Sequence, residues 1–311
     1  MKDPLVIGSR GSKLALIQTE TVKAELERLT TGREFRIEII KTSGDVSKDP
    51  LSVIGGKGVF TKELEDALLD GRIDIAVHSL KDLPTVLPSS VALAAICKRD
   101  DPRDALVLPV SGKPKTSRGS GFESLRKGSA IGTSSQRRLA QLKHLRPDVI
   151  FKDLRGNVDT RLRKLDEGQY DALVLACAGL RRLGLENRIS VALPSDQMLP
   201  AVGQGALAIE TRSDDADTIA MVGNLDHKFT RLACAAERAF LKGLGGGCQL
   251  PIAGYAVVRD KKLRLQGLVM DKEGKMELRG QLSGPIIEAE KIGAQLAEQL
   301  LAQGADKLLA G

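Results

Sequence analysis

Apolar residues follow two alternating spacings along the first two thirds of the chain. Runs of strand length occur at 4–9, 35–42, 73–79 and 91–97, and residues 12–29 and 61–69 between them carry apolar positions three or four apart. Strand-like runs that alternate with helix-like stretches predict an α/β sheet.

The same alternation starts again after a charged segment. DDPRD at 100–104 combines acidic residues with a proline, so we expect the chain to cross between domains there. The strands expected beyond it span 130–133, 149–154 and 172–177, and the helices span 135–145 and 158–165. A second α/β domain is therefore predicted.

The pattern changes after LPAVGQGALAIE at 199–210. A long helix at 228–241 is expected to bury Phe229 and Phe240 among other apolar residues. Three alternating strands follow at 252–258, 263–270 and 276–282, and then a helix at 287–301. These elements predict a third, small α+β domain with a three-stranded antiparallel sheet.

One cysteine stands apart from the other three. Cys97 and Cys177 end apolar runs and Cys234 lies in a helical pattern, so all three are expected in the core. Cys248 follows three glycines in LGGGCQLPIAGY and precedes a proline, which predicts an exposed turn. We expect a thiol there that is available for covalent chemistry.

The net charge of +7 is regional rather than spread over the chain. Residues 118–188 carry 11 Arg and 4 Lys against 8 acidic residues, and the rest of the chain is balanced. Aromatic residues make up 3% of the chain and Trp is absent, which disfavours stacking on nucleic acid. An anionic small molecule fits this basic region better.

The same composition bears on metals and location. Three His and scattered Cys offer no metal-ligand spacing, so no metal is expected. No apolar run approaches the length that crosses a bilayer, and four Cys without close pairing favour a reducing compartment. We therefore expect a cytoplasmic protein with no membrane partner.

Polar motifs follow several predicted strands. VHSLKDLP at 77–84 brings Asp82 to the end of a strand, where α/β sheets bind ligands, although aspartate before proline is also an ordinary turn. GTSSQRR at 132–138 offers hydroxyls and two arginines at a helix start, a natural anion site. LRGNVDTR at 154–161 and AGLRRLG at 178–184 also place arginines after a predicted strand. Together these motifs suggest one cleft for several carboxylates or phosphates.

Eight motifs in order resemble the porphobilinogen deaminase family: RGSKLALIQ, GGKGVFTKELE, HSLKDLP, DDPRDAL, GTSSQRR, LRGNVDTRLRKL, LPAVGQGALAIE and GGGCQLPIAGY. The resemblance runs from Leu5 to the C-terminal helix. It implies two domains similar to a two-lobed periplasmic binding protein and a third that carries a cofactor cysteine. The implied domains are 1–99 with a return segment 204–223, then 104–199, then 227–311.

The resemblance also implies an activity. Members of this family are transferases that join four porphobilinogen molecules head to tail with loss of ammonia, which yields hydroxymethylbilane for haem and other tetrapyrroles. The growing chain is anchored on a dipyrromethane cofactor, and Cys248 matches the residue that holds it through a thioether. Asp82 matches the catalytic carboxylate. A hexapyrrole carries twelve carboxylates, which gives a reason for the basic region. A monomer is expected.

The remaining site residues are also carried over by motif. Those expected to bind the cofactor, besides Cys248, are Ser12, Lys81, Thr133, Ser135, Arg137, Arg138, Arg155 and Asn157. Those expected to bind the substrate are Arg10, Gln18, Lys57, Phe60, Arg161 and Arg182.

Two other classes of protein stay open. A two-lobed solute-binding or sensor protein for a polycarboxylate would share the fold of the first 220 residues but would not need Cys248. A nucleic-acid-binding protein would explain the positive charge alone.

Overall fold

The computed structural model describes residues 4–46, 58–110, 122–247 and 249–310. The chain divides into two compact units, Met1–Asp100 with Ala206–Leu232, and Asp101–Gly205 with Ala233–Gly311. In the part of the chain described, no helix is long and apolar enough to cross a membrane.

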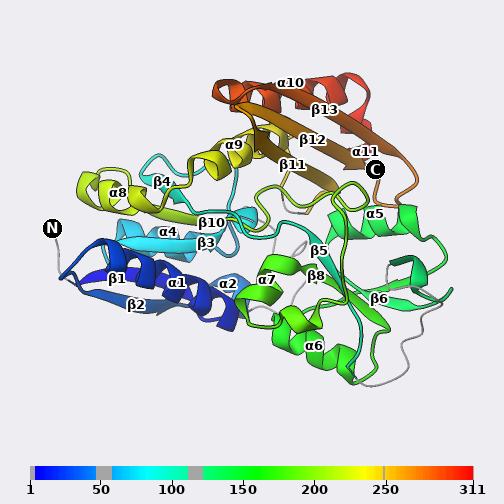
Figure 1. Cartoon of the computed structure of the whole chain (residues 1–311), viewed down its shortest axis with the longest axis horizontal. Coiled ribbons are helices and arrows are strands. Elements are labelled where there is room, and N and C mark those ends of the chain that lie inside the picture. The colour runs from blue at the N-terminus through cyan, green and yellow to red at the C-terminus, as the bar shows by residue number, and fades with distance from the viewer. Residues whose placement is uncertain (1–3, 47–57, 111–121, 248, 311) are drawn as a thin grey trace. The chain divides into compact units, whose positions relative to one another are not determined.

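The first unit is built on a five-stranded sheet of order β2-β1-β3-β10-β4 (Figure 1). Its strands are β1 (Leu5–Arg10), β2 (Phe35–Ile40), β3 (Ile75–Ser79), β4 (Val91–Ile96) and β10 (Leu207–Arg212). β1 runs parallel to β2 and β3, whereas β10 is antiparallel to both of its neighbours. The parallel strands therefore end at one edge of the sheet.

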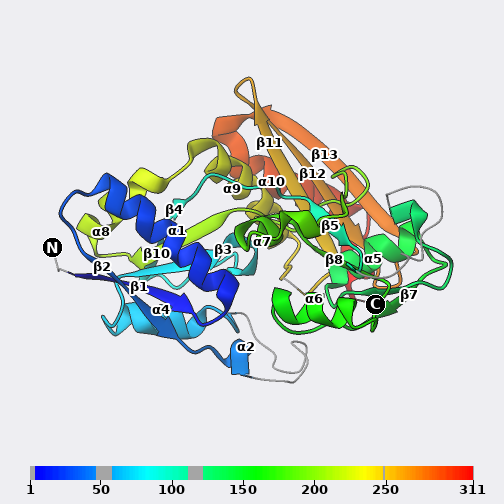
Figure 2. The same cartoon turned by 60° about the horizontal axis from the view of Figure 1, so that its bottom comes forward.

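Helices cover both faces of this sheet. The helices are α1 (Lys13–Leu29), α2 (Ser43–Val46), α4 (Lys62–Leu69) and α8 (Ala216–Val222), with 3₁₀ turns at Leu80–Asp82 and Gly223–Leu225. Apolar residues of α1 and α8 pack with Leu5 and Ile7 on one face, and those of α4 pack with Val6 and Ala76 on the other. Figure 2 shows α1 and α4 on opposite sides of β1.

The second unit contains a sheet of order β7-β6-β8-β5-β9. Its strands are β5 (Asp104–Val107), β6 (Ala130–Gly132), β7 (Ile150–Lys152), β8 (Ala172–Ala176) and β9 (Val191–Ala192). Its helices are α5 (Gln136–Leu145), α6 (Val158–Asp166) and α7 (Cys177–Arg182), with 3₁₀ turns at Phe122–Ser124 and Glu186–Arg188. β6 is parallel to β7 and β8, so the three junctions that follow these strands meet at one edge.

The second unit also holds an antiparallel sheet of β11 (Ile252–Arg259), β12 (Lys262–Met270) and β13 (Glu277–Pro285). With it are α9 (Lys228–Gly243), which begins in the first unit, α10 (Ala289–Ala302), α11 (Ala305–Ala310) and a 3₁₀ turn at Ile286–Glu288. A Cβ at Gly267 would lie 2.5 Å from the Phe240 ring, so glycine allows α9 to approach β12 closely.

The predicted fold class is confirmed: two α/β sheets and a small three-stranded antiparallel sheet. The expected burial of Phe229 is wrong, because this side chain is 50% exposed in the first turn of α9 and meets His227 edge-on at 6.3 Å between ring centroids. The helix instead buries Glu237, whose carboxylate accepts hydrogen bonds from the backbone N–H groups of Gly203 and Ala256.

Candidate active site

Asp82 ends the 3₁₀ turn that directly follows β3. The backbone N–H of Leu80 donates to the carbonyl of Ala206 at 3.0 Å, and the N–H of Leu83 donates to the carbonyl of Leu80 at 3.2 Å. The turn is therefore fixed at both ends, and the half-buried Asp82 carboxyl is held at the carboxyl end of a buried strand.

A small pocket of about 60 Å³ lies beside Asp82 in the first unit. Of the residues predicted for the site, it is lined by Arg10, Ser12, Gln18, Phe60 and Asp82. They meet because β1 and β3 are parallel neighbours: Arg10 ends β1, Ser12 caps α1, and Asp82 follows β3. Lys81 is half-buried next to Asp82 but is not part of the lining.

Two contacts order the pocket wall. The Arg10 guanidinium carbon lies 4.1 Å from the centre of the Phe60 ring, a cation–π distance. The buried Gln18 amide donates to the Ser79 hydroxyl at 3.0 Å. Cationic and amide groups thus stand beside the Asp82 carboxylate.

A buried acidic cluster lies next to this pocket. His78 and Thr61 belong to the lining, and the His78 Nε2 lies 2.9 Å from the Glu210 carboxylate, with both side chains buried. Burial, and then the Glu210 carboxylate, raise the pKa of Glu65. Glu65 and Glu210 were not predicted as site residues; the only signals were their places in the KELE and ALAIE motifs.

The junction between β6 and α5 holds four predicted residues. Ser135 caps α5 by accepting a hydrogen bond from the Arg138 N–H, and the Thr133 hydroxyl accepts one from the Ser135 N–H at 3.3 Å. Arg137 and Arg138 follow in the first turn of the helix, where both are buried.

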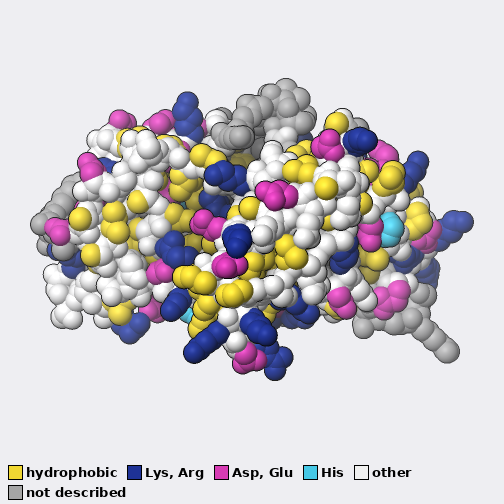
Figure 3. All heavy atoms as spheres, turned by 90° about the horizontal axis from the view of Figure 1, so that it is seen from above, with side chains coloured by type: hydrophobic (Ala, Val, Ile, Leu, Met, Phe, Trp, Pro, Cys, Tyr) yellow, Lys and Arg dark blue, Asp and Glu magenta, His cyan; other side chains and the backbone are white. Residues whose placement is uncertain are grey.

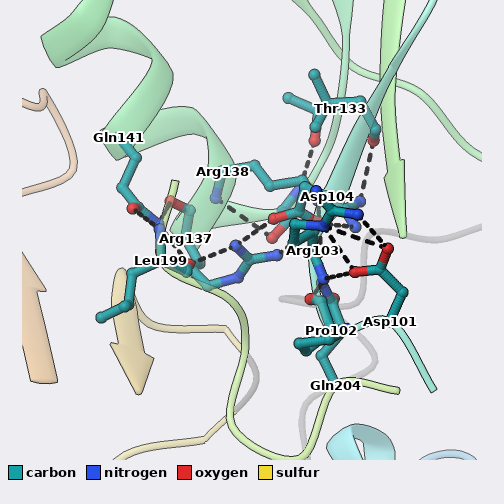
Figure 4. Close-up of polar contacts among 12 residues, drawn as sticks. Asp101, Pro102, Arg103, Asp104, Thr133, Arg137, Arg138, Gln141, Leu199 and Gln204 are labelled. Atoms are coloured by element: carbon teal, nitrogen blue, oxygen red, sulfur yellow. Dashed lines mark hydrogen bonds and ion pairs between the residues drawn. The ribbon is translucent and has the colours of Figure 1, made fainter. Parts of the chain in front are cut away.

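Both arginines bind one carboxylate, that of Asp104 at the start of β5 (Figure 4). Arg137 donates to the two Asp104 oxygens at 2.6 and 3.2 Å, and Arg138 donates to one of them at 2.7 and 3.0 Å. Burial alone would raise the pKa of Asp104, but the two guanidiniums outweigh it and hold that pKa well below its usual range. The cluster therefore carries two positive charges against one negative charge.

Sequence reasoning placed Asp104 in the charged break at 100–104 and missed this role. The arginines lie 33 and 34 residues further along the chain, and only the order of strands in the sheet brings them to Asp104. The local signal was an acidic residue directly before an apolar strand.

The junction between β7 and α6 is tied to the same edge. The Ser134 hydroxyl donates to the carbonyl of Leu154 at 2.7 Å and accepts from its N–H at 2.9 Å. Arg155 pairs with Asp153 at 3.1 Å, Asn157 stands at the N-cap of α6, and the half-buried Arg161 donates to the carbonyl of Gly156.

Arg182 ends α7, at the third junction. Its guanidinium donates to the carbonyl of Gly205 at 2.5 Å. Its neighbour Arg181 lies 3.3 Å from the Asp101 carboxylate, which also binds Arg103 at 2.7 Å. The first two predicted junctions thus carry arginines near the start of the helix, whereas at the third Arg181 and Arg182 lie in the last turn of α7.

Two predicted residues, Lys57 and Cys248, lie outside the described residues. Of the described cysteines, Cys177 and Cys234 are fully buried and Cys97 is partly buried. Burial raises the pKa of the Cys177 thiol to about 12, which suits a core residue. Across the described segments, no three His, Cys, Asp or Glu side chains are grouped so as to hold a metal ion.

Comparison with known proteins decides the family. Residues 5–220 match the family model "Porphobilinogen deaminase, dipyromethane cofactor binding domain", and 231–302 match the C-terminal domain of porphobilinogen deaminase. The chain belongs to the porphobilinogen deaminase family. The porphobilinogen deaminase of Synechococcus elongatus is 50% identical over 98% of this chain and 94% of its own length. The Roseiflexus sp. protein of the same name is 49% identical over the full length of both.

Among solved structures, the periplasmic VFT2 domain of BvgS from Bordetella pertussis is similar with a TM-score of 0.41 and 16% identity. The match covers 72% of this chain and 86% of that domain. Within the porphobilinogen deaminase family match, every described candidate residue lies inside the cofactor-binding region 5–220.

Proposed function

We propose that this enzyme joins four porphobilinogen molecules head to tail, releases one ammonia for each, and with the uptake of one water yields the linear tetrapyrrole hydroxymethylbilane. The observation that carries the proposal is the Asp82 carboxylate in a pocket with Arg10, Ser12 and Gln18. A carboxylate and a guanidinium on one wall suit a substrate that develops positive charge while it carries acetate and propionate groups.

Asp82 has three tasks in this chemistry. Loss of ammonia leaves a cationic methylene pyrrolenine, and the Asp82 carboxylate stabilises that cation by its opposite charge. The same oxygens orient pyrrole N–H groups and accept the proton that the attacking ring loses when the new carbon–carbon bond forms. Arg10, held over Phe60, binds a substrate carboxylate and so keeps the reacting ring beside Asp82.

We further propose that a dipyrromethane is bound to the Cys248 sulfur through a thioether. This group supplies the primer on which the chain grows. The donor set fits a polycarboxylate, because the two buried arginines outnumber Asp104 and the hydroxyls of Thr133 and Ser135 stand beside them. Buried Cys177 and Cys234 offer no comparable thiol.

The other residues divide by the group they bind. For the cofactor we propose Ser12, Lys81, Thr133, Ser135, Arg137, Arg138, Arg155 and Asn157. For the substrate we propose Arg10, Gln18, Lys57, Phe60, Arg161 and Arg182. For Arg10, Ser12, Lys81, Thr133 and Ser135 the support is their place after parallel strands, where α/β sheets bind ligands. Lys57 is proposed from its motif alone.

The proposal includes an arrangement and a location. The domains are 1–99 with 204–223, then 104–199, then 227–311, in a monomeric cytoplasmic enzyme. Sedimentation of the purified protein tests the monomer, and limited proteolysis followed by mass analysis of the fragments tests the domain boundaries.

Incubation of the purified protein with porphobilinogen tests the reaction. We expect one ammonia to be released for each porphobilinogen consumed. The product should give a porphyrin after acid oxidation. A two-lobed binding protein would bind porphobilinogen and release it unchanged. Binding without any ammonia would therefore overturn the proposal and favour that second class.

A further inference from the structure

We propose that Asp104 is a positioning residue that fixes Arg137 and Arg138 as a paired receptor for carboxylates of the pyrrole chain. The inference rests on the proposed function, because it takes the two arginines as cofactor-binding groups. Asp104 itself is fully buried and acts through the two guanidiniums.

Asp104 brings together two side chains that the helix alone would separate. Successive residues on a helix point about 100° apart, so the side chains at 137 and 138 would normally diverge. Asp104 lies on β5, which β8 separates from β6 in the sheet, and accepts hydrogen bonds from both guanidiniums, which brings the two groups to one carboxylate (Figure 4). The strand thus imposes an arrangement that α5 alone would not give.

Each of the two guanidiniums has more N–H donors than its described hydrogen bonds use. Each guanidinium has five N–H groups. Arg137 uses three hydrogen bonds, two to Asp104 and one to the carbonyl of Leu199 at 2.9 Å. Arg138 also uses three, two to Asp104 and one to the carbonyl of Val174 at 3.0 Å. In the contacts described, each arginine therefore keeps donors for a further acceptor.

Asp104 and the two arginines together carry a surplus positive charge. Asp104 stays ionised, because the guanidiniums outweigh the effect of its burial on its pKa. One carboxylate against two guanidiniums leaves a surplus positive charge among buried groups, which is costly without an anion. A carboxylate of the ligand supplies both the missing charge and the missing acceptors.

Asp104 and Arg137 are each held by further hydrogen bonds. The Gln204 amide donates to Asp104 at 3.0 Å and to the carbonyl of Pro102 at 2.7 Å. Leu199 exchanges hydrogen bonds with Gln141 at 2.7 and 3.1 Å and accepts one from Arg137. These contacts leave Asp104 and Arg137 little freedom to move, as a preorganised receptor requires.

Asp101 offers a matched control. It is also an acidic residue bound to two arginines, Arg103 and Arg181, and its side chain is 7% exposed. Those arginines are 41% and 47% exposed, and neither is proposed to bind the cofactor. Asp101→Asn therefore tests the general cost of losing a carboxylate from this region.

The experiment compares full-length wild type with Asp104→Asn, Asp104→Glu and Asp101→Asn. Intact mass gives the fraction that carries two linked porphobilinogen units, and circular dichroism confirms that each protein is folded. We expect Asp101→Asn to match wild type. Asp104→Glu keeps the charge but misplaces it, and we expect roughly a hundredfold slower cofactor assembly from porphobilinogen.

The outcomes separate the two proposals. Folded Asp104 variants that lack the linked units, beside a loaded wild type, support the inference. If Asp104→Asn does not fold, Asp104→Glu decides alone. A folded Asp104→Glu with full loading and unchanged KM and kcat overturns the inference and makes Asp104 merely structural. A wild type without linked units overturns the proposed function itself.

Discussion

The Asp82 carboxylate differs from most acidic side chains of the chain in the surroundings that the fold gives it. It stands at the end of a buried strand, on a turn fixed through Leu80, and it faces a pocket that Arg10 and Gln18 also line. An aspartate that served only to shape the turn would need none of these neighbours. Substitutions of Asp82 should therefore show whether the negative charge or the shape of this side chain matters.

Asp82→Asn should fold and keep its cofactor but lose turnover, because the amide keeps the shape without the negative charge opposite the developing cation. Proton transfer is worth about 10²- to 10⁴-fold and charge stabilisation about 10²- to 10³-fold, so we expect a loss of at least about a hundredfold in kcat. Asp82→Glu should keep slight activity. Near wild-type turnover by a loaded Asn variant would return Asp82 to a turn-shaping role, and Asp45 would be the next carboxylate to test.

Glu65 gives a prediction about pH. Its pKa is raised by burial and by Glu210, so the folded state keeps this proton to higher pH than the unfolded state does. The contribution of protonated Glu65 to the free energy of unfolding is fully present below the unfolded pKa of about 4.3. It is lost as pH rises through the folded pKa. The gain of Glu65→Gln over wild type in free energy of unfolding should therefore grow with rising pH.

Glu63 on the same helix is the control of opposite sign. Burial would raise its pKa, but hydrogen bonds from the Ser43 backbone N–H at 2.7 Å and from the Ser43 side chain, together with the charge of Lys62, outweigh burial and lower it. The contribution of ionised Glu63 to the free energy of unfolding is present above the unfolded pKa and is lost as pH falls through the folded pKa. Glu63→Gln should therefore be less stable than wild type at neutral pH. Denaturant unfolding at several pH values measures both. Parallel curves for the two variants would contradict the account.

At the scale of elements, the sequence predicted what is local and missed what depends on strand order. The β6–α5 junction could be predicted because its turn, cap and helix all lie within GTSSQRR. β5 and β10 were missed as strands, since each is antiparallel to a partner distant in the chain. The predicted strand 172–177 gives way at Cys177 to α7, where the helix begins inside an apolar run with no capping side chain to signal it.

The link between the first two arginine junctions of the second unit depends on Ser134. Ser134→Ala removes both of its hydrogen bonds to the buried Leu154 and leaves a backbone N–H and carbonyl without them. We expect a loss of about 1 to 3 kcal/mol in the free energy of unfolding. Ser129→Ala is the control, because the buried Ser129 hydroxyl has no hydrogen-bond partner among the described residues. Equal stability of the two variants would show that Ser134 does not tie the junctions.

At the scale of the whole molecule, the position of the charge matters more than its total. The surplus lies within 118–188, and the arginines there follow three strands that end at one edge of a sheet. On the face shown in Figure 3, basic and acidic side chains are interspersed, as on an ordinary solvated surface. Of the arginines in this segment, Arg137 and Arg138 are buried, and they suit the binding of a chain that gains two carboxylates with every unit.

Loss of one such arginine should stop elongation at a definite stage. In Arg155→His or Arg182→Ala, a ligand carboxylate loses its guanidinium partner, so the stage at which that carboxylate is bound becomes unfavourable. Native mass spectra after a limited dose of porphobilinogen should show an altered distribution of enzyme with one to four added units. A uniformly slower enzyme with an unchanged distribution would mean that these arginines only support the fold.

The enzyme is proposed to build its product on two porphobilinogen units bound to Cys248. Intact mass of the freshly purified protein tests it most directly, with Cys248→Ser measured beside it. We expect an addition equal to two linked porphobilinogen units on wild type and none on the variant. An unmodified wild type that still makes hydroxymethylbilane, or the same addition on Cys248→Ser, would contradict it.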